Sequence, residues 1–181
     1  MVYITTNRPL GASVHLDRGS LYVCTVPLLS GKFHWSLIHI TETGVATRHH
    51  WAAVGANPQG RETYVKQTLP RGPLTASATQ ILGYFKVTAY RTGNGVVRDP
   101  DGFWEVCKSV FPQSYPTAEE NRQHNISCRT WVTNVLQGLG IARAQALKVE
   151  QAVTSHSQAC ETRYLRSYLN SEPYQIVIDE I

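Results

Sequence analysis

The stretch His124-Asn125-Ile126-Ser127-Cys128-Arg129-Thr130-Trp131-Val132-Thr133-Asn134-Val135-Leu136 predicts a polar turn that leads into an amphipathic helix. Ser127 suits the N-cap position, because its hydroxyl can accept one of the unpaired N–H groups of a helix start. The apolar residues recur at the spacing of one helical face: Trp131, Val132, Val135, Leu136 and Leu139. Gly138 and Gly140 mark the expected end of the helix. Cys128 is therefore expected at the first helical position, on the interior side.

A thiol at a helix N-terminus feels the positive end of the helix dipole, which favours the reactive thiolate. Free cysteine is also among the most buried residue types, so a small core residue is the alternative for Cys128. The other cysteines, Cys24, Cys107 and Cys160, are widely spaced and form no C-x-x-C pair. This spacing disfavours a disulfide framework or a thiolate zinc site. Cys107 is expected to be a core residue.

The composition is that of a soluble globular protein. The 181 residues suffice for one domain, 1–181, and 42% of them are hydrophobic while 17% are charged. No apolar run is long enough for a membrane span, and no signal peptide opens the sequence, so we expect a cytoplasmic protein. The net charge of +4 is mild, its basic residues are scattered, and no nucleic-acid-binding motif is present. Asn125-Ile126-Ser127 matches a glycosylation sequon, whose glycan would cover Cys128 in a secreted protein.

Two β-rich runs, 33–40 and 45–54, flank the turn Thr41-Glu42-Thr43-Gly44 and predict a β-hairpin. If Ile40 pairs with Val45, His49 lies diagonally from His34 on the same face of the hairpin. A shift of one residue would place His50 there instead of His49. The hairpin is thus expected to bring two imidazoles together.

The remaining segments complete an α+β fold, in which an antiparallel β-sheet packs against helices. Strands are expected at 21–29, 63–69, 81–90 and 174–178, and helices at 102–111, 142–153 and 161–169. Residues 113–124 are expected to form a polar lead-in to the Cys128 helix, and 1–19 an irregular segment. Turns are expected at 70–73 and 92–95.

These segments hold the parts of a thiol-based catalytic site. A thiol nucleophile needs a base within hydrogen-bond reach, and the base needs a third group that orients it. Cys128 is the candidate nucleophile, His34 the base and His49 the third residue. The N–H of Cys128 and the side chains of Asn125 or Gln123 are candidate oxyanion and substrate donors.

Each candidate has a structural alternative. His34 is a common type of structural strand histidine, and His49-His50 are explained equally well as exposed residues near a strand end. Asn125 is a typical turn residue, and Gln123 a typical surface residue. His34, His49 and Cys128 could instead bind zinc, although the spacings of the known zinc motifs are absent and no metal is expected.

The segments His34-Trp35-Ser36-Leu37-Ile38, Gly44, His49 and Ser127-Cys128-Arg129-Thr130-Trp131-Val132 resemble the circularly permuted papain-like proteins. These include the permuted NlpC/P60 group, the lecithin-retinol-acyltransferase-like proteins and the PPPDE peptidases. In them a strand histidine precedes a Gly turn, a second strand carries another polar residue, and a later cysteine opens a helix. The His-Trp-Ser-Leu and Cys-Arg-x-Trp-Val segments also look like uncharacterised fungal proteins. The resemblance covers residues 21–54 and 122–140, about a third of the chain.

The resemblance implies a permuted papain-like fold, with an antiparallel sheet packed on the cysteine helix. It implies a hydrolase or acyltransferase that acts on an amide or ester through a thioacyl intermediate, without a cofactor. Cys128 would be the nucleophile, His34 the base and His49 the third residue, and the partner a small-molecule or peptide acyl substrate. Two other functions remain open: a non-catalytic binding domain on the same scaffold, and a biosynthetic acyl or aminoacyl transferase that forms an amide or ester.

Overall fold

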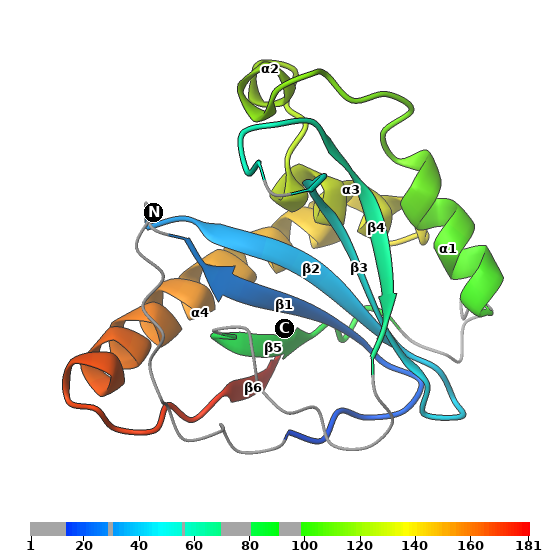
Figure 1. Cartoon of the computed structure of the whole chain (residues 1–181). Helices are drawn as coiled ribbons and strands as arrows, with labels where there is room; N and C mark the ends of the chain where they lie inside the picture. The colour runs from blue at the N-terminus through cyan, green and yellow to red at the C-terminus, as the bar shows by residue number, and fades with distance from the viewer. Residues whose placement is uncertain (1–13, 29–30, 56, 70–80, 91–98) are drawn as a thin grey trace.

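The computed structural model describes residues 14–28, 31–55, 57–69, 81–90 and 99–181, which form a six-stranded mixed sheet packed against helices (Figure 1). The strands are β1 (Leu21–Pro27), β2 (Phe33–Ile40), β3 (Ala46–Ala53), β4 (Glu62–Thr68), β5 (Gly83–Lys86) and β6 (Val177–Glu180). The helices are α1 (Pro100–Ser109), α2 (Ala118–Gln123), α3 (Cys128–Gly138) and α4 (Arg143–Leu169). The predicted α+β class is confirmed at this level.

The strand order is β4-β3-β2-β1-β5-β6. Four of the pairings are antiparallel, but β6 runs parallel to β5, so the expectation of a purely antiparallel sheet was wrong at this edge. The physical reason is the connection between them, which includes α3 and α4. A crossover of this kind returns the chain to the sheet in the same direction, whereas a tight hairpin would reverse it.

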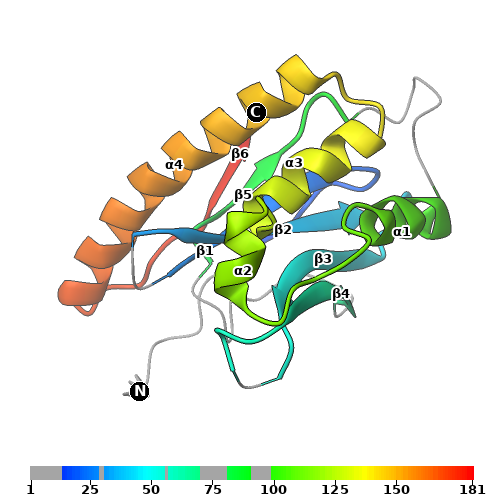
Figure 2. The same cartoon turned by 90° about the horizontal axis from the view of Figure 1, so that it is seen from above.

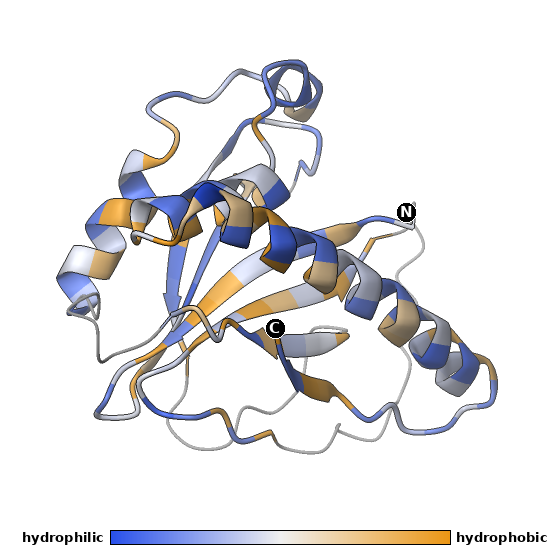
Figure 3. Ribbon diagram, turned by 180° about the vertical axis from the view of Figure 1, so that it is seen from behind, coloured by the Kyte–Doolittle hydropathy of each residue, from blue (hydrophilic) through white to orange (hydrophobic). Residues whose placement is uncertain are grey.

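Helices α3 and α4 lie on the same face of the sheet (Figure 2). Strand alternation sends Phe33, Trp35 and Leu37 of β2 towards this helical face, where Trp35 and Leu37 join the larger hydrophobic core. Ile38, the residue after Leu37, points to the opposite face and joins a second apolar cluster with Tyr22 of β1. Seen from behind, α4 crosses in front of the hydrophobic strands and carries hydrophilic residues on its outer side (Figure 3).

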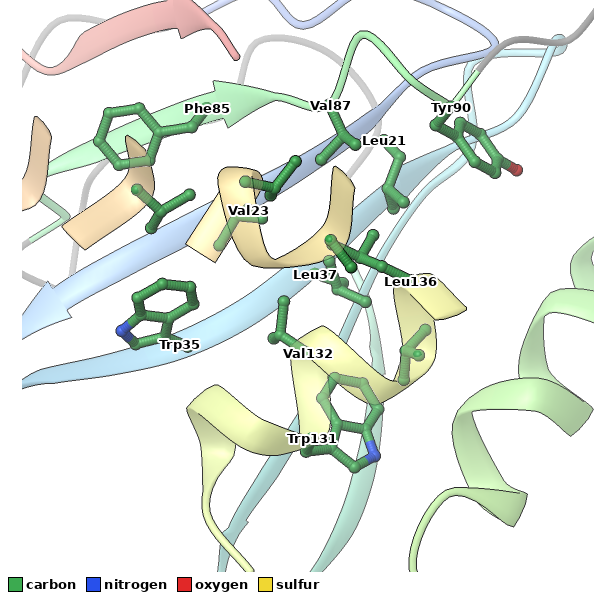
Figure 4. Packing of buried hydrophobic residues seen from close by; sticks show 14 of the residues in the cluster. Leu21, Val23, Trp35, Leu37, Phe85, Val87, Tyr90, Trp131, Val132 and Leu136 are labelled. Atoms are coloured by element: carbon green, nitrogen blue, oxygen red, sulfur yellow. The ribbon is translucent and has the colours of Figure 1, made fainter. Parts of the chain in front are cut away.

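The position of α3 is fixed by its apolar side. Val132 and Leu136 lie against Trp35 and Leu37 of β2 (Figure 4), and all four side chains are buried. Trp131 is fully buried, and its indole N–H donates to the Cys107 carbonyl of α1 over 3.1 Å. Cys107 is buried, as predicted. The apolar stripe seen in the sequence is therefore the face that anchors the helix.

The predicted β2–β3 hairpin is present, but its register differs by one residue from the Ile40–Val45 pairing. Ile40 pairs with Ala46 and Leu37 with His49. The turn is longer than expected, because Gly44 adopts a positive φ of 83° and the Thr41 hydroxyl accepts the N–H of Val45. Every β3 side chain therefore lies on the face opposite to the one predicted from an Ile40–Val45 pair.

Other elements differ from their predicted bounds. The expected helices 142–153 and 161–169 are one continuous helix, α4, whose middle is held by a 2.9 Å hydrogen bond between Ser157 and Thr25 of β1. Within the predicted polar lead-in, α2 forms behind a capping box of Thr117 and Glu120. Strand β5 has four residues rather than the ten predicted.

The expected turns at 70–73 and 92–95, and most of the irregular segment at 1–19, fall outside the described residues. Among the helices that the structure describes, none combines the length and apolarity that a membrane span requires.

Candidate active site

Cys128 is the first residue of α3, as the sequence predicts. Ser127 caps the helix by accepting the N–H of Thr130, and the Thr130 hydroxyl accepts the N–H of Ser127 in return. The Cys128 side chain is partly exposed, whereas Cys24, Cys107 and Cys160 are buried. Its thiol donates to the carbonyl of Phe33 in β2, with Sγ 3.9 Å from the oxygen.

The thiol contacts β2 beyond the end of its pairing with β3. The N–H of Ile40 donates to the carbonyl of Ser20. The N–H and C=O groups of Ile40 and of every second residue before it therefore point towards β1. The backbones of Phe33 and Trp35 accordingly point towards β3. Pairing with β3 nevertheless ends at Leu37–His49, and the two strands diverge from their shared turn (Figure 1). Cys128 therefore contacts the part of β2 that is no longer hydrogen-bonded to β3.

Two histidines meet between β2 and β3, beyond the last pair of the ladder. His34 Nε2 of β2 lies 2.8 Å from His50 Nδ1 of β3, and the rings meet edge to face with centroids 5.1 Å apart. The observed register places both rings on the face of the sheet away from α3. His34 thus gains an imidazole partner, as predicted, but the partner is His50.

His49 lies on the helical face instead. Its Nδ1 is 2.6 Å from the Tyr64 hydroxyl, its ring packs against Phe103 of α1, and its side chain is buried. The predicted register would give His49 a shared face with His34, and in the observed register the two lie on opposite faces. The register also separates His34 and His49 as ligands of the alternative zinc site. Within the described ranges, no group of three or more His, Cys, Asp or Glu side chains is arranged to hold a metal ion.

Both rings of the histidine pair are neutral at pH 7. Burial lowers the pKa of His34 to about 4, with further lowering by the positive charges of Arg48 and Arg122. Burial also lowers the pKa of His50 to about 3, together with Arg48 and His34. A neutral imidazole can accept a proton, so the pair has the protonation state that a general base requires.

The thiol is also neutral in this structure. Burial raises the pKa of Cys128, and Glu62 acts in the same direction. The backbone N–H of Trp35, the guanidinium of Arg122 and the N–H of Arg129 lower it, but burial outweighs them. The helix start does act towards the thiolate, through the N–H of Arg129, but burial raises the pKa of Cys128 by more. Among the described residues, no hydrogen bond joins Cys128 to His34, so formation of the thiolate requires the thiol to leave Phe33.

An ion pair between the buried Glu62 and the exposed Arg122 supports the turn before Cys128. Arg122 of α2 binds both carboxylate oxygens of Glu62 in β4, at 2.6 and 2.7 Å, and donates to the carbonyl of Ile126 at 2.5 Å. Asn121 donates to Glu62 at 3.1 Å, and its own backbone carbonyl accepts the N–H of Ile126. Sequence reasoning missed this network. The Thr117-x-x-Glu120 capping box was a signal for α2, but nothing in the sequence links Arg122 to a residue 60 positions away.

Asn125 and Gln123 border the same turn. Asn125 has a positive φ of 57°, a conformation that asparagine tolerates better than most residues, and its carbonyl accepts the Thr130 hydroxyl. Gln123 is the last residue of α2, and both side chains are exposed. The backbone role of Asn125 supports its alternative as a turn residue, and contact of either side chain with a substrate stays a prediction.

The site therefore includes a partly exposed thiol at a helix start, a neutral histidine pair on the adjoining strands and an Arg122–Glu62 ion pair behind the turn. Comparison of the chain with protein-family models, curated proteins and solved structures gave no match.

Proposed function

We propose that this chain is a thiol-dependent hydrolase or acyltransferase that acts on an amide or ester bond through an acyl group carried on Cys128. The observation that supports the proposal is the contact of the Cys128 thiol with the carbonyl of Phe33, the residue that precedes His34, whose ring pairs with His50. A permuted papain-like scaffold, implied by the sequence resemblance, is part of the same proposal.

The hydrogen bond of the pair assigns a role to each ring nitrogen. His34 Nε2 is engaged with His50, and among the described residues none hydrogen-bonds His34 Nδ1. In the proposed tautomer, His34 Nε2–H donates to His50 Nδ1, which leaves His34 Nδ1 as the proton acceptor. His50 thus takes the orienting role that the sequence had suggested for His49.

In the proposed reaction, the Cys128 thiol turns from the Phe33 carbonyl and gives its proton to His34 Nδ1. The sulfur attacks the acyl carbon, and the N–H of Cys128 stabilises the oxygen that becomes negative. The C–N or C–O bond then breaks, and the leaving group takes the proton from His34. Water or an acceptor amine or alcohol next attacks the thioester, its proton passes through His34, and the free thiol returns. The choice between water and another acceptor separates a hydrolase from a transferase.

The second candidate is a non-catalytic binding domain. It is favoured by the raised pKa of Cys128 and by the donation of its thiol to a backbone carbonyl. In that case the thiol is a packing residue and the histidines hold the two strands together at their open end.

Intact-protein mass spectrometry with p-nitrophenyl acetate, an activated ester, tests the two candidates. The proposal predicts one acetyl group on the wild-type protein, mapped to Cys128 by peptide analysis and absent from Cys128→Ala. Removing the base in His34→Ala should slow acetylation by roughly 10²–10⁴-fold. Cys160→Ala is the matched control, since Cys160 is buried in α4, and it should react like the wild type. Equal acetylation rates in wild type and His34→Ala would favour the binding domain.

A further inference from the structure

A second polar cluster lies on the sheet face away from α3. Arg48 pairs with Ile38 in the β2–β3 register, so it shares that face with Ser36 on β2 and His50 on β3. The Arg48 Nε donates to the Ser36 hydroxyl over 3.2 Å, and Ser36 in turn donates to the Cys24 carbonyl. With His34, these side chains surround one patch of β2 and β3.

Arg48 lacks the carboxylate that a guanidinium in this setting usually has. It is only partly exposed, it lies opposite the buried Ile38, and its charge acts on the pKa of the buried Cys24 and Tyr84. None of the ion pairs among the described residues includes it. The rest of the sequence offers no partner either, because the ranges outside the described residues contain no aspartate or glutamate.

A partly desolvated charge without a counter-ion is costly, and a bound anion removes that cost. The Nε–Ser36 bond holds the guanidinium in place, and no residue that the structure describes accepts from its two terminal nitrogens, Nη1 and Nη2. These are the donors that bind a carboxylate or phosphate in the two-pronged manner. The adjacent imidazoles of His34 and His50 are neutral, so they bring no competing negative charge. When His34 Nε2–H donates to His50, the Nε2–H of His50 is the ring donor left for an anion.

We propose that Arg48, together with Ser36 and the His34–His50 pair, forms a binding site for the carboxylate or phosphate group of a ligand. This site does not depend on the proposed function, because anion binding needs neither the thiol nor its proton transfer. If Cys128 also reacts as proposed, the shared His34 means that the acyl substrate bears the anionic group.

Titration of the histidine-labelled protein with inorganic phosphate and with acetate, followed by NMR of the imidazole resonances at constant ionic strength, tests the site. We expect saturable shifts of His34 and His50, because an anion beside neutral imidazoles raises their pKa. No acyl donor is present, so the result is separate from the reactivity of Cys128. Saturation by acetate alone assigns a carboxylate ligand, and saturation by phosphate alone assigns a phosphate ligand.

Arg48→Gln should weaken the binding by about tenfold or more, as expected for loss of a charged hydrogen-bonding group. Arg48→Lys keeps the positive charge but loses the paired N–H donors of the guanidinium, so it should bind with intermediate affinity. This variant still tests the site if Arg48→Gln folds poorly. Arg61→Gln is the control, because Arg61 is exposed in the loop before β4, and it should bind like the wild type. Equal binding by wild type and both Arg48 variants, or an equal response to chloride, would overturn the proposal.

Discussion

His34 Nε2 of β2 and His50 Nδ1 of β3 lie 2.8 Å apart, beyond the last pair of the ladder between the two strands. This contact exists because β3 is shifted by one residue relative to the simplest hairpin register, which puts His50 on the face of His34 and buries His49 on the other. The two adjacent histidines therefore have different environments, and substitutions at each should have different effects.

His50→Gln should slow acetylation of Cys128, because His34 loses the partner that holds its ring and tautomer. The loss should be smaller than the roughly 10²–10⁴-fold expected for removal of the base itself. His49→Phe should leave the acetylation rate unchanged but destabilise the fold by about 1 kcal/mol, since the hydroxyl of the partly buried Tyr64 loses its partner. Ester kinetics and urea unfolding of both variants check this contrast. The opposite pattern would show that His49 is the third residue.

Glu62 and Arg122 should affect the Cys128 thiol with opposite signs. Arg122 lowers the thiol pKa and Glu62 raises it, so Arg122→Gln should move the pH dependence of iodoacetamide alkylation upwards and Glu62→Gln downwards. Arg122→Gln should also cost about 1–3 kcal/mol of stability, because the buried Glu62 carboxylate keeps only Asn121 as a side-chain partner. Glu62→Gln should cost less, because the Arg122 side chain is 45% exposed. A general loosening of the site would move both variants in the same direction, which would contradict an electrostatic role.

The acetylation rate should begin to fall only at a pH below the pKa of an ordinary histidine; this fall is the acid limb of the pH profile. Because the pKa of His34 is lowered to about 4, the ring remains in its basic form as the pH falls from 7 to 5.5. The acetylation rate should therefore stay nearly constant over this interval, as measured with buffers of equal ionic strength. In Arg48→Gln, which loses one of the charges that lower this pKa, the limb should move to higher pH. A wild-type limb centred near pH 6.5 would show that His34 is not the titrating base.

The buried histidines should make the fold sensitive to acid. The pKa values of His39 and His49 are lowered to about 4 and about 3, mainly by burial, whereas an unfolded chain protonates histidine near pH 6.5. Below about pH 6.5 the unfolded state binds more protons, so stability is fully present above that pH and falls towards pH 4. The slope contributed by each histidine is up to about 1.4 kcal/mol per pH unit. Urea unfolding between pH 7 and pH 4 measures it, and His39→Gln should flatten the curve.

Removal of the α3 cap should have a modest and local effect. Ser127→Ala deletes the hydroxyl that accepts the Thr130 N–H and should cost about 1 kcal/mol. Ser127→Asp preserves an acceptor and should retain most of the stability. Thermal unfolding compares the two variants, and equal loss in both would mean that the hydroxyl does not act as a cap.

Local signals predicted the parts of this fold that local interactions determine. The Ser127 cap, the apolar stripe from Trp131 and the terminal glycines defined α3 to within a residue. The hairpin was also evident, but its register depended on the Thr41 hydroxyl and on the conformation of Gly44. Neither is visible in a pattern of alternating residues.

Long-range contacts account for what the sequence did not predict. Two helices are predicted where α4 is continuous, and the contact of Ser157 in the middle of α4 with Thr25 of β1 helps to hold the helix as one. Helix α2 is too short to show an apolar period, and its Arg122 meets Glu62 only in the folded protein. The nucleophile candidate was therefore predictable, while the groups that tune it were not.

The turn from Thr41 to Val45 also constrains how this gene can change. Strand side chains alternate between two faces, so loss or gain of a single codon in the turn would exchange every inward and outward residue of β3. The change would expose Trp51 and separate His50 from His34. Insertions or deletions of two codons preserve the alternation. Length variation in this loop is thus expected to be tolerated in even steps and selected against in odd ones.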